Sequence, residues 1–199
     1  SVLKDKTLKE KFKNIKKIYF SRRKFGKAAA TEFGEEYIEQ CFNQNGYESL
    51  GPETLTLREQ IYVWNHAEAI ACMNGTIPLN VVFCKNEKLK LTILNKMSIY
   101  HKNPYIYLYM RNIQAEFIDI YKEPLKGYPK SLGEGPYLIK TGKEFFHYCQ
   151  REKFEIPYTG MKLKFYDLKQ EIRYYLCVIG IRNKIRRVGS YIKRKILRR

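Results

Sequence analysis

Aspartate is scarce in this chain of 199 residues, and so are the short motifs that hold metals and phosphates. Only Asp5, Asp119 and Asp167 are present, and none belongs to an Asp-x-Asp pair, which argues against a divalent cation held by such a motif. GxGxxG, Walker and Gly-x-Ser-x-Gly motifs are absent as well. The three histidines stand apart from one another. We therefore predict no metal site and no bound cofactor.

The cysteines and the apolar runs argue against a disulfide-stabilised protein and against a membrane-spanning one. The five cysteines are odd in number and show no CxxC or Cys/His metal spacing, which favours reduced core thiols in a cytosolic chain over a disulfide framework. The longest apolar run, residues 174–181, is far below the about 20 residues that span a bilayer. We recognise no signal peptide, and because the first residue is Ser1 we expect a fragment that lacks an N-terminal domain.

The formal net charge of +18 is confined to the two ends of the chain. Residues 1–27 hold eleven Lys or Arg and two acids, a net charge of +9. Residues 172–199 hold ten Lys or Arg and no acid, whereas residues 28–171 hold seventeen bases and eighteen acids. A nucleic-acid groove spreads its positive charge over the folded face that it uses. This distribution therefore argues against nucleic acid as a partner.

Short apolar runs alternate with amphipathic segments in the first half of the chain. Helical periodicity and capping residues predict helices at residues 35–45, 57–67 and 78–84. Strands are predicted at residues 18–20, 47–50, 69–73 and 89–94. Alternation with short connections predicts an α/β fold, with a Rossmann-like parallel sheet flanked by helices.

Two local signals support the predicted helices. Thr56 and Glu59 have the spacing of a capping box, and the following helix is expected to bury Leu57, Ile61 and Trp64. Beyond residue 95 the pattern weakens, and residues 125–142 are expected to form a loop. Further helices are predicted at residues 105–110, 113–120, 145–153 and 161–175.

The basic segment Ser21, Arg22, Arg23 and Lys24 directly follows the first predicted strand. In an open α/β sheet, ligands bind beyond the carboxyl ends of the strands. Adjacent arginines placed there can neutralise a pyrophosphate, because guanidinium groups donate paired, charge-assisted hydrogen bonds. A solvated basic loop explains the same residues equally well.

A second candidate segment, Asn74, Gly75 and Thr76, follows the third predicted strand. Glycine allows close approach of the backbone to a ligand, and the N-terminus of the next helix offers free amides to a phosphate. An Asn-Gly pair is also a common structural turn. The two segments at one edge of the sheet indicate a phosphate site more strongly than either does alone.

The order of these motifs resembles glycosyltransferase family 61, which includes bacterial capsule and lipooligosaccharide enzymes. The resemblance covers about residues 16–95 and rests on ordered spacing. The matching elements are Tyr19-Phe20-Ser21-Arg22-Arg23-Lys24, Glu35-Glu36, Gly46-Tyr47-Glu48, Pro52-Glu53-Thr54-Leu55, Glu59-Gln60, Ala67-Glu68-Ala69-Ile70, and Asn74-Gly75 through Asn80 to Phe83-Cys84.

The resemblance implies the nucleotide-sugar-binding, C-terminal half of a GT-B enzyme. Such an enzyme transfers a sugar with inversion, without an Asp-x-Asp metal, to a glycan or lipid-linked acceptor. Arg22 and Arg23 would stabilise the leaving diphosphate, Gly75 and its neighbours would hold phosphate or ribose, and Glu59 would contact donor hydroxyls. The expected domains are a lead-in at residues 1–15, the nucleotide-sugar-binding domain at residues 16–171 and a basic helix at residues 172–199.

The sequence departs from the family pattern in the second segment. Asn74 occupies the place of a histidine, Ile77 that of a glycine and Leu79 that of a threonine, while Gly75 and Asn80 keep the pattern. Asparagine can donate a hydrogen bond to phosphate or sugar but does not titrate near neutral pH. A degenerate, non-catalytic module that docks on a partner enzyme or a membrane is therefore the alternative.

Residues 172–199 combine an apolar helical face with many cations. Such a helix lies in the plane of an anionic membrane surface, attracted by about 1 kcal/mol per well-placed cation. This pattern predicts a peripheral location on the inner, cytoplasmic face of the cell membrane. Packing of the helix on a missing domain is the alternative.

Overall fold

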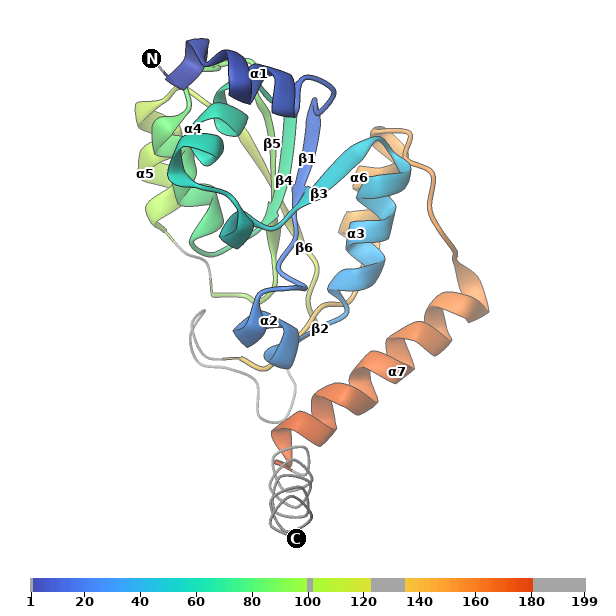
Figure 1. Ribbon diagram of the computed structural model, residues 1–199. Coiled ribbons are helices and arrows are strands. Elements are labelled where there is room, and N and C mark those ends of the chain that lie inside the picture. Colours follow the sequence, from blue (N-terminus) through green and yellow to red (C-terminus); the bar gives the residue numbers. More distant parts are fainter. Residues whose placement is uncertain (1, 100–101, 123–134, 181–199) are drawn as a thin grey trace, which may run out of the picture.

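The protein is described by a computed structural model that covers residues 2–99, 102–122 and 135–180 (Figure 1). Its centre is a five-stranded, fully parallel sheet in the order β3-β1-β4-β5-β6. The strands are β3 (Tyr47–Leu50), β1 (Lys17–Phe20), β4 (Ala69–Met73), β5 (Lys90–Asn95) and β6 (Ala115–Asp119). With helices on both faces, this is the predicted Rossmann-like α/β architecture.

Helices cover the two faces of the sheet in separate groups (Figure 1). One face carries α3 (Glu35–Gln44) and α6 (Lys143–Arg151). The other carries α1 (Lys6–Phe12), α4 (Leu57–His66), the 3₁₀ helix η3 (Ile77–Phe83) and α5 (Asn103–Met110). The remaining elements are η1 (Val2–Lys4), α2 (Gly26–Thr31), β2 (Glu32–Phe33), η2 (Pro52–Thr54), β7 (Tyr137–Leu138) and α7 (Gly160–Val178).

The strands bury both of their faces, and alternate residues enter different cores. On β1, Ile18 and Phe20 belong to the core beneath α4, whereas Tyr19 belongs to the core beneath α3. On β4, Ile70 and Cys72 belong to the first core. This alternation follows from the two-residue period of a strand. A sheet buried on both faces explains why its strands read as continuous apolar runs.

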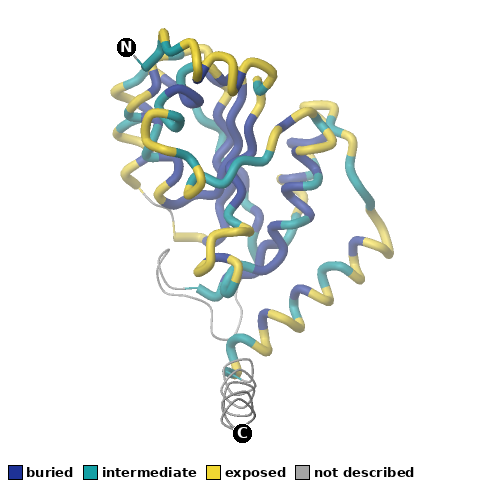
Figure 2. The backbone as a smooth tube through the Cα atoms, in the orientation of Figure 1, coloured by how far each residue is buried: buried dark blue, intermediate teal, exposed yellow. Residues whose placement is uncertain are grey.

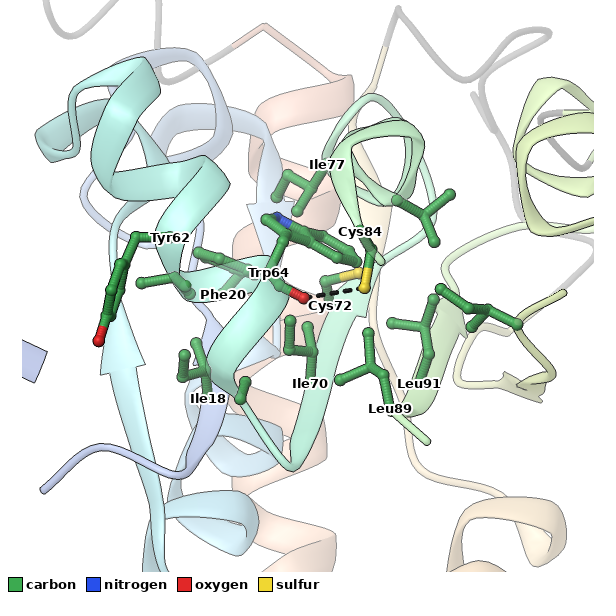
Figure 3. Packing of buried hydrophobic residues seen from close by; sticks show 14 of the residues in the cluster. Ile18, Phe20, Tyr62, Trp64, Ile70, Cys72, Ile77, Cys84, Leu89 and Leu91 are labelled. Carbon is green, nitrogen blue, oxygen red and sulfur yellow. Dashed lines mark hydrogen bonds between the residues drawn. The ribbon is translucent and has the colours of Figure 1, made fainter. Parts of the chain in front are cut away.

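Trp64 lies at the centre of the α4-side core, where Figure 3 shows it against the sheet. Its side chain is fully buried and stacks on Phe20, with ring centroids 5.8 Å apart. The thiol of Cys84 donates a hydrogen bond to the Trp64 carbonyl over 2.9 Å, which ties the end of η3 to α4. The five cysteines are free thiols, four of them buried, as expected of a reduced core.

Several local predictions are confirmed. The Thr56 side chain accepts from the Glu59 amide, and the Glu59 carboxylate accepts from the Thr56 amide, which completes the capping box. Gly46, the expected stop of the helix at residues 35–45, follows α3 with a φ of +81°, a conformation that glycine adopts without strain. The lead-in at residues 1–15, which is expected to form a short amphipathic helix, contains α1, and this helix buries Leu8 and Phe12.

Three local predictions are wrong. Residues 113–120 are not a helix, because Ala115–Asp119 pair with β5 as the parallel strand β6, and Ile113 and Ile118 enter different cores. Leu57 lies in the first turn of α4 and is 59% exposed, since that helix buries Tyr62, Val63 and Trp64 instead. The basic loop expected at residues 21–31 contains the short helix α2 in its second half.

The C-terminal part of the described chain is the long helix α7. It runs from Gly160 through residue 171 to Val178, so the expected domain boundary at 171/172 falls inside one continuous helix. Residues 181–199, the greater part of the expected basic helix, lie outside the described residues. Among the residues described, no helix combines the length and apolarity needed to cross a membrane.

Candidate nucleotide-binding site

The direction in which the chain adds strands to the sheet reverses between β1 and β4. From β1 the chain passes to β3 on one side and then crosses to β4 on the other, after which β5 and β6 follow in order. Ligands of open parallel sheets bind beyond the carboxyl ends of the strands at such a switch point. The predicted segments, residues 21–24 and 74–76, follow these two strands.

Arg22 and Gly75 are brought together at this point. A Cβ atom built on Gly75 would lie 3.8 Å from Arg22 Nη1. Gly75 is buried, and Arg22 is partly buried. The contact joins residues that are far apart in the sequence, because β1 and β4 are parallel neighbours with Phe20 opposite Cys72. The structure therefore places a guanidinium beside a backbone that has no side chain to cover it.

Arg22 also belongs to a buried ionic cluster that sequence reasoning did not find. Its Nη2 lies 3.2 Å from Glu32 Oε1, and the ammonium of Lys96 lies 2.7 Å from the same oxygen. The side chains of Glu32 and Lys96 are only 3% and 2% exposed. Lys96 also lies over the ring of Tyr137, 4.1 Å from its centroid. Burial lowers the pKa of the Lys96 ammonium, and the Glu32 carboxylate opposes that shift.

The cluster has unused hydrogen-bonding capacity. Within the described residues, the buried Nε of Arg22 and the buried Oε2 of Glu32 have no hydrogen-bond partner. A buried donor without an acceptor costs about 1–3 kcal/mol. Two cations also face one carboxylate, so the three side chains together carry one excess positive charge. An anion that accepts from Arg22 would satisfy the donor and balance this charge.

Glu35 opens helix α3 and anchors the backbone of the arginine loop. Its Oε1 accepts hydrogen bonds from the Tyr19 hydroxyl over 3.1 Å and from the Arg22 amide over 2.8 Å. The residue is 3% exposed. Burial raises the pKa of this carboxyl to about 7, and the nearby Glu32 carboxylate raises it further, whereas both hydrogen bonds oppose the shift. The sequence suggested an acidic start of this helix but not its contact with the loop.

Arg23 forms its ion pairs with the acidic residues of α3. Its guanidinium lies 2.7 Å from Glu39 and 3.5 Å from Glu36, and its amide donates to Ser21 Oγ over 3.3 Å. Lys24, the last residue of the predicted segment, is exposed. The two adjacent arginines thus make separate ion pairs.

Asn74 is fixed in a row of polar side chains that crosses the ends of three strands. Its Nδ2 donates to Asn95 Oδ1, and Asn95 Nδ2 donates to Asp119 Oδ1, each over 2.8 Å. Asn74 is 1% exposed, and its Oδ1 has no partner among the described residues. Thr76, next but one in the chain, is exposed. Asn74 is therefore chiefly a structural link between β4 and β5 that leaves one acceptor unused.

The two remaining predicted residues are engaged with α4. The Asn80 side chain donates to Gln60 Oε1 over 2.9 Å. Glu59 completes the capping box and pairs with Lys11, whose hydrogen bond is the main reason that the Glu59 pKa falls to about 2. These contacts hold Glu59 against α1 and the helix cap.

A pocket of about 230 Å³ opens beside the ionic cluster, between α2, α3 and α7. This volume is below the about 300 Å³ at which small-molecule pockets usually begin. Among the residues described, no group of three or more His, Cys, Asp or Glu side chains is arranged to hold a metal. The pocket is lined chiefly by Arg23, Glu32, Glu35, Tyr166, Gln170 and Arg173.

Comparison with known families adds to this geometry. The family model described as glycosyltransferase 61 matches residues 1–92, which span β1, β3, β4 and the start of β5. Neither the curated proteins nor the solved structures searched contain a significant match. The matched stretch contains Arg22, Glu32, Glu35 and Gly75. The match covers somewhat less than half of the chain, and it shows that this stretch is similar to the glycosyltransferase 61 family.

Proposed function

We propose that this chain binds the diphosphate of a nucleotide-sugar donor at the switch point between β1 and β4. The match to the glycosyltransferase 61 family model supports glycosyltransferase activity in general. The observation that carries the proposal for the site is the contact of Arg22 with Gly75. A guanidinium beside a backbone without a side chain, at the carboxyl edge of a parallel sheet, suits a phosphate in both charge and shape.

The charge balance of the cluster supports the same ligand. Glu32 is shared by Arg22 and Lys96, so a phosphate oxygen can accept from the unpartnered Arg22 Nε without breaking the Lys96 ion pair. During transfer, negative charge develops on the leaving diphosphate. A positive group already in place stabilises that charge at no cost in reorganisation.

The reaction that we propose is inverting transfer of a hexosyl or pentosyl group to a glycan or lipid-linked acceptor in bacterial surface polysaccharide synthesis. In a GT-B arrangement, a second Rossmann-like domain would face this one and present the acceptor. The family resemblance motivates these details. The residues of this chain contribute donor binding and stabilisation of the leaving group, and we assign no catalytic base among them.

Calorimetric titration with nucleoside diphosphates tests the proposal. We expect UDP, GDP or another nucleoside diphosphate to bind, and Arg22→Ala to weaken that binding at least tenfold, a loss of about 1.4 kcal/mol or more. Lys88→Ala removes the same charge from an exposed turn before β5 and should leave binding unchanged. Unaltered affinity in Arg22→Ala, with the variant folded, would remove the site that we propose.

One observation favours a second function, a module that binds without catalysing transfer. Asn74 stands in the place of the family histidine, and its side-chain amide donates a hydrogen bond to Asn95. The Arg23 guanidinium is held in ion pairs with Glu39 and Glu36. Such a module would dock on a partner enzyme or a membrane. It would bind a membrane or a partner, but it would transfer no sugar and release no nucleoside diphosphate from a nucleotide-sugar donor, even when upstream sequence is restored and an acceptor is supplied.

A further inference from the structure

Helix α7 is partly packed on the body of the protein and partly open. Its inner face buries Leu163, Gln170 and Tyr174, and Figure 2 shows buried and exposed positions alternating along it. Its acidic residues also face inward. Glu171 pairs with Lys122 and Lys140, and Asp167 lies 4.0 Å from Lys140.

The opposite face of α7 is an uninterrupted apolar stripe. Seven large apolar side chains of the helix and its C-cap are between 37% and 66% exposed. From residue 161 to residue 179 they recur at intervals of four, three, four, three and four, with residue 176 beside them, so they share one side of a helix. The outer stripe consists of Met161, Phe165, Leu168, Ile172, Tyr175, Leu176 and Ile179.

The stripe is long and is bordered by one sign of charge. At 1.5 Å per residue, it extends for about 27 Å. The other exposed side chains of α7 are Lys162, Lys164, Lys169 and Arg173. Every exposed side chain of the helix is therefore apolar or basic. Contiguous apolar surface of this kind marks an interaction site in a soluble domain.

We infer that the outer stripe of α7 lies in the plane of an anionic lipid surface. Leucine, isoleucine and aromatic side chains would enter the boundary between headgroups and acyl chains, and the flanking lysines and Arg173 would meet lipid phosphates. The sequence that follows, residues 181–199, adds nine Lys or Arg and no acid. This sign of charge is complementary to an anionic membrane.

The same charges disfavour a second copy of the chain on this face. In a pair of α7 helices that meet along their stripes, the flanking cations of one copy would face cations of the other. Like charges that border a helix interface destabilise the pairing. Nucleic acid fits no better, because the centre of the surface is apolar and the cations lie at its margins.

Co-sedimentation of the full chain with vesicles tests the inference. Binding is expected to vesicles of phosphatidylcholine that contain about 30% phosphatidylglycerol, and to be much weaker with phosphatidylcholine alone or in high salt. The double variant Phe165→Gln/Ile172→Gln keeps every cation and uses good helix formers. It should lose at least tenfold in affinity for the anionic vesicles.

A matched control is available on α5, on the other side of the sheet (Figure 1). Ile106 and Tyr109 are 60% and 90% exposed, and Ile106→Gln/Tyr109→Gln should bind as the wild type does. Circular dichroism would verify that both variants fold. Wild-type binding by the α7 variant would mean that basic charge alone attracts the lipid, and would overturn the inference. A wild-type dimer in light scattering that this variant abolishes would overturn it in favour of a second copy.

Discussion

Arg22 lies against Gly75, with its Nη1 3.8 Å from the place that a side chain on Gly75 would occupy. The two residues follow β1 and β4, which are adjacent in the sheet although β3 and α4 come between them in the chain. The contact therefore depends on the crossover at the switch point. It defines the space in which we place the donor diphosphate.

Enlarging residue 75 should close that space. A distance of 3.8 Å is ordinary van der Waals contact, so Gly75→Ala should fold with a stability within about 1 kcal/mol of wild type. Gly75→Leu adds three further carbons beside the guanidinium, and we expect it to weaken nucleoside diphosphate binding at least tenfold in calorimetry. If Gly75→Leu is folded and binds normally, the phosphate lies elsewhere.

Glu32 should matter more for stability than either of the cations that it binds. Glu32→Gln removes the carboxylate that lies 2.7 Å from the ammonium of Lys96, which is 2% exposed, and breaking a buried pair in this way costs about 3–5 kcal/mol. Lys96→Met leaves Glu32 paired with Arg22, so its cost should be smaller. Urea unfolding of the two variants gives the comparison. Equal losses would contradict the sharing of one carboxylate by two cations.

Asn74 should tolerate no acidic replacement. Its Nδ2 donates to Asn95 Oδ1, and Asn95 in turn is held by Asp119. In Asn74→Asp an acceptor would face the Asn95 oxygen, and rotation of the Asn95 amide would break its bond to Asp119. We expect a loss of about 1–3 kcal/mol in the free energy of unfolding. Thr76→Asp, an exposed change two residues later, should have little effect.

Much of the fold was predictable from residue patterns because the signals were local. The capping box at Thr56 and the stop at Gly46 act within a few residues. The apolar runs of β1 and β4 report burial on both faces. Strand β6 was missed because its short run, which contains Phe117 and Ile118, suits a buried helix as well as a strand. Only pairing with β5 decides between them.

The sequence predicted the edge of the sheet at which the candidate site lies, but it did not predict all of the residues that gather there. The rule that ligands meet the carboxyl ends of strands located Arg22 and Gly75 correctly at one edge. The same rule covers Lys96, which directly follows β5, but it gives no partner for that residue, because Glu32 belongs to a two-residue strand beside β7. Their ion pair joins segments 64 residues apart, and no periodicity reports such a contact.

The buried carboxyl of Glu35 should leave a signature in the pH dependence of stability. Its pKa in the folded protein is about 7, above the about 4.3 of an unfolded chain. The folded state therefore holds the proton more tightly. Stability contributed by this group is complete below about pH 4 and is lost as the pH rises through 7, by on the order of 3 kcal/mol.

Glu35→Gln should remove that loss and keep the local structure. Both hydrogen bonds to Glu35, from Tyr19 and from the Arg22 amide, end on the same oxygen, which the glutamine carbonyl can replace. In urea unfolding between pH 5 and 8, the free energy of unfolding of the variant should increase relative to that of the wild type as the pH rises. Glu36→Gln changes the partly exposed neighbour, and the stability of this variant should fall with rising pH as that of the wild type does. Parallel curves for wild type and Glu35→Gln would show that this carboxyl does not titrate in the folded protein in that range.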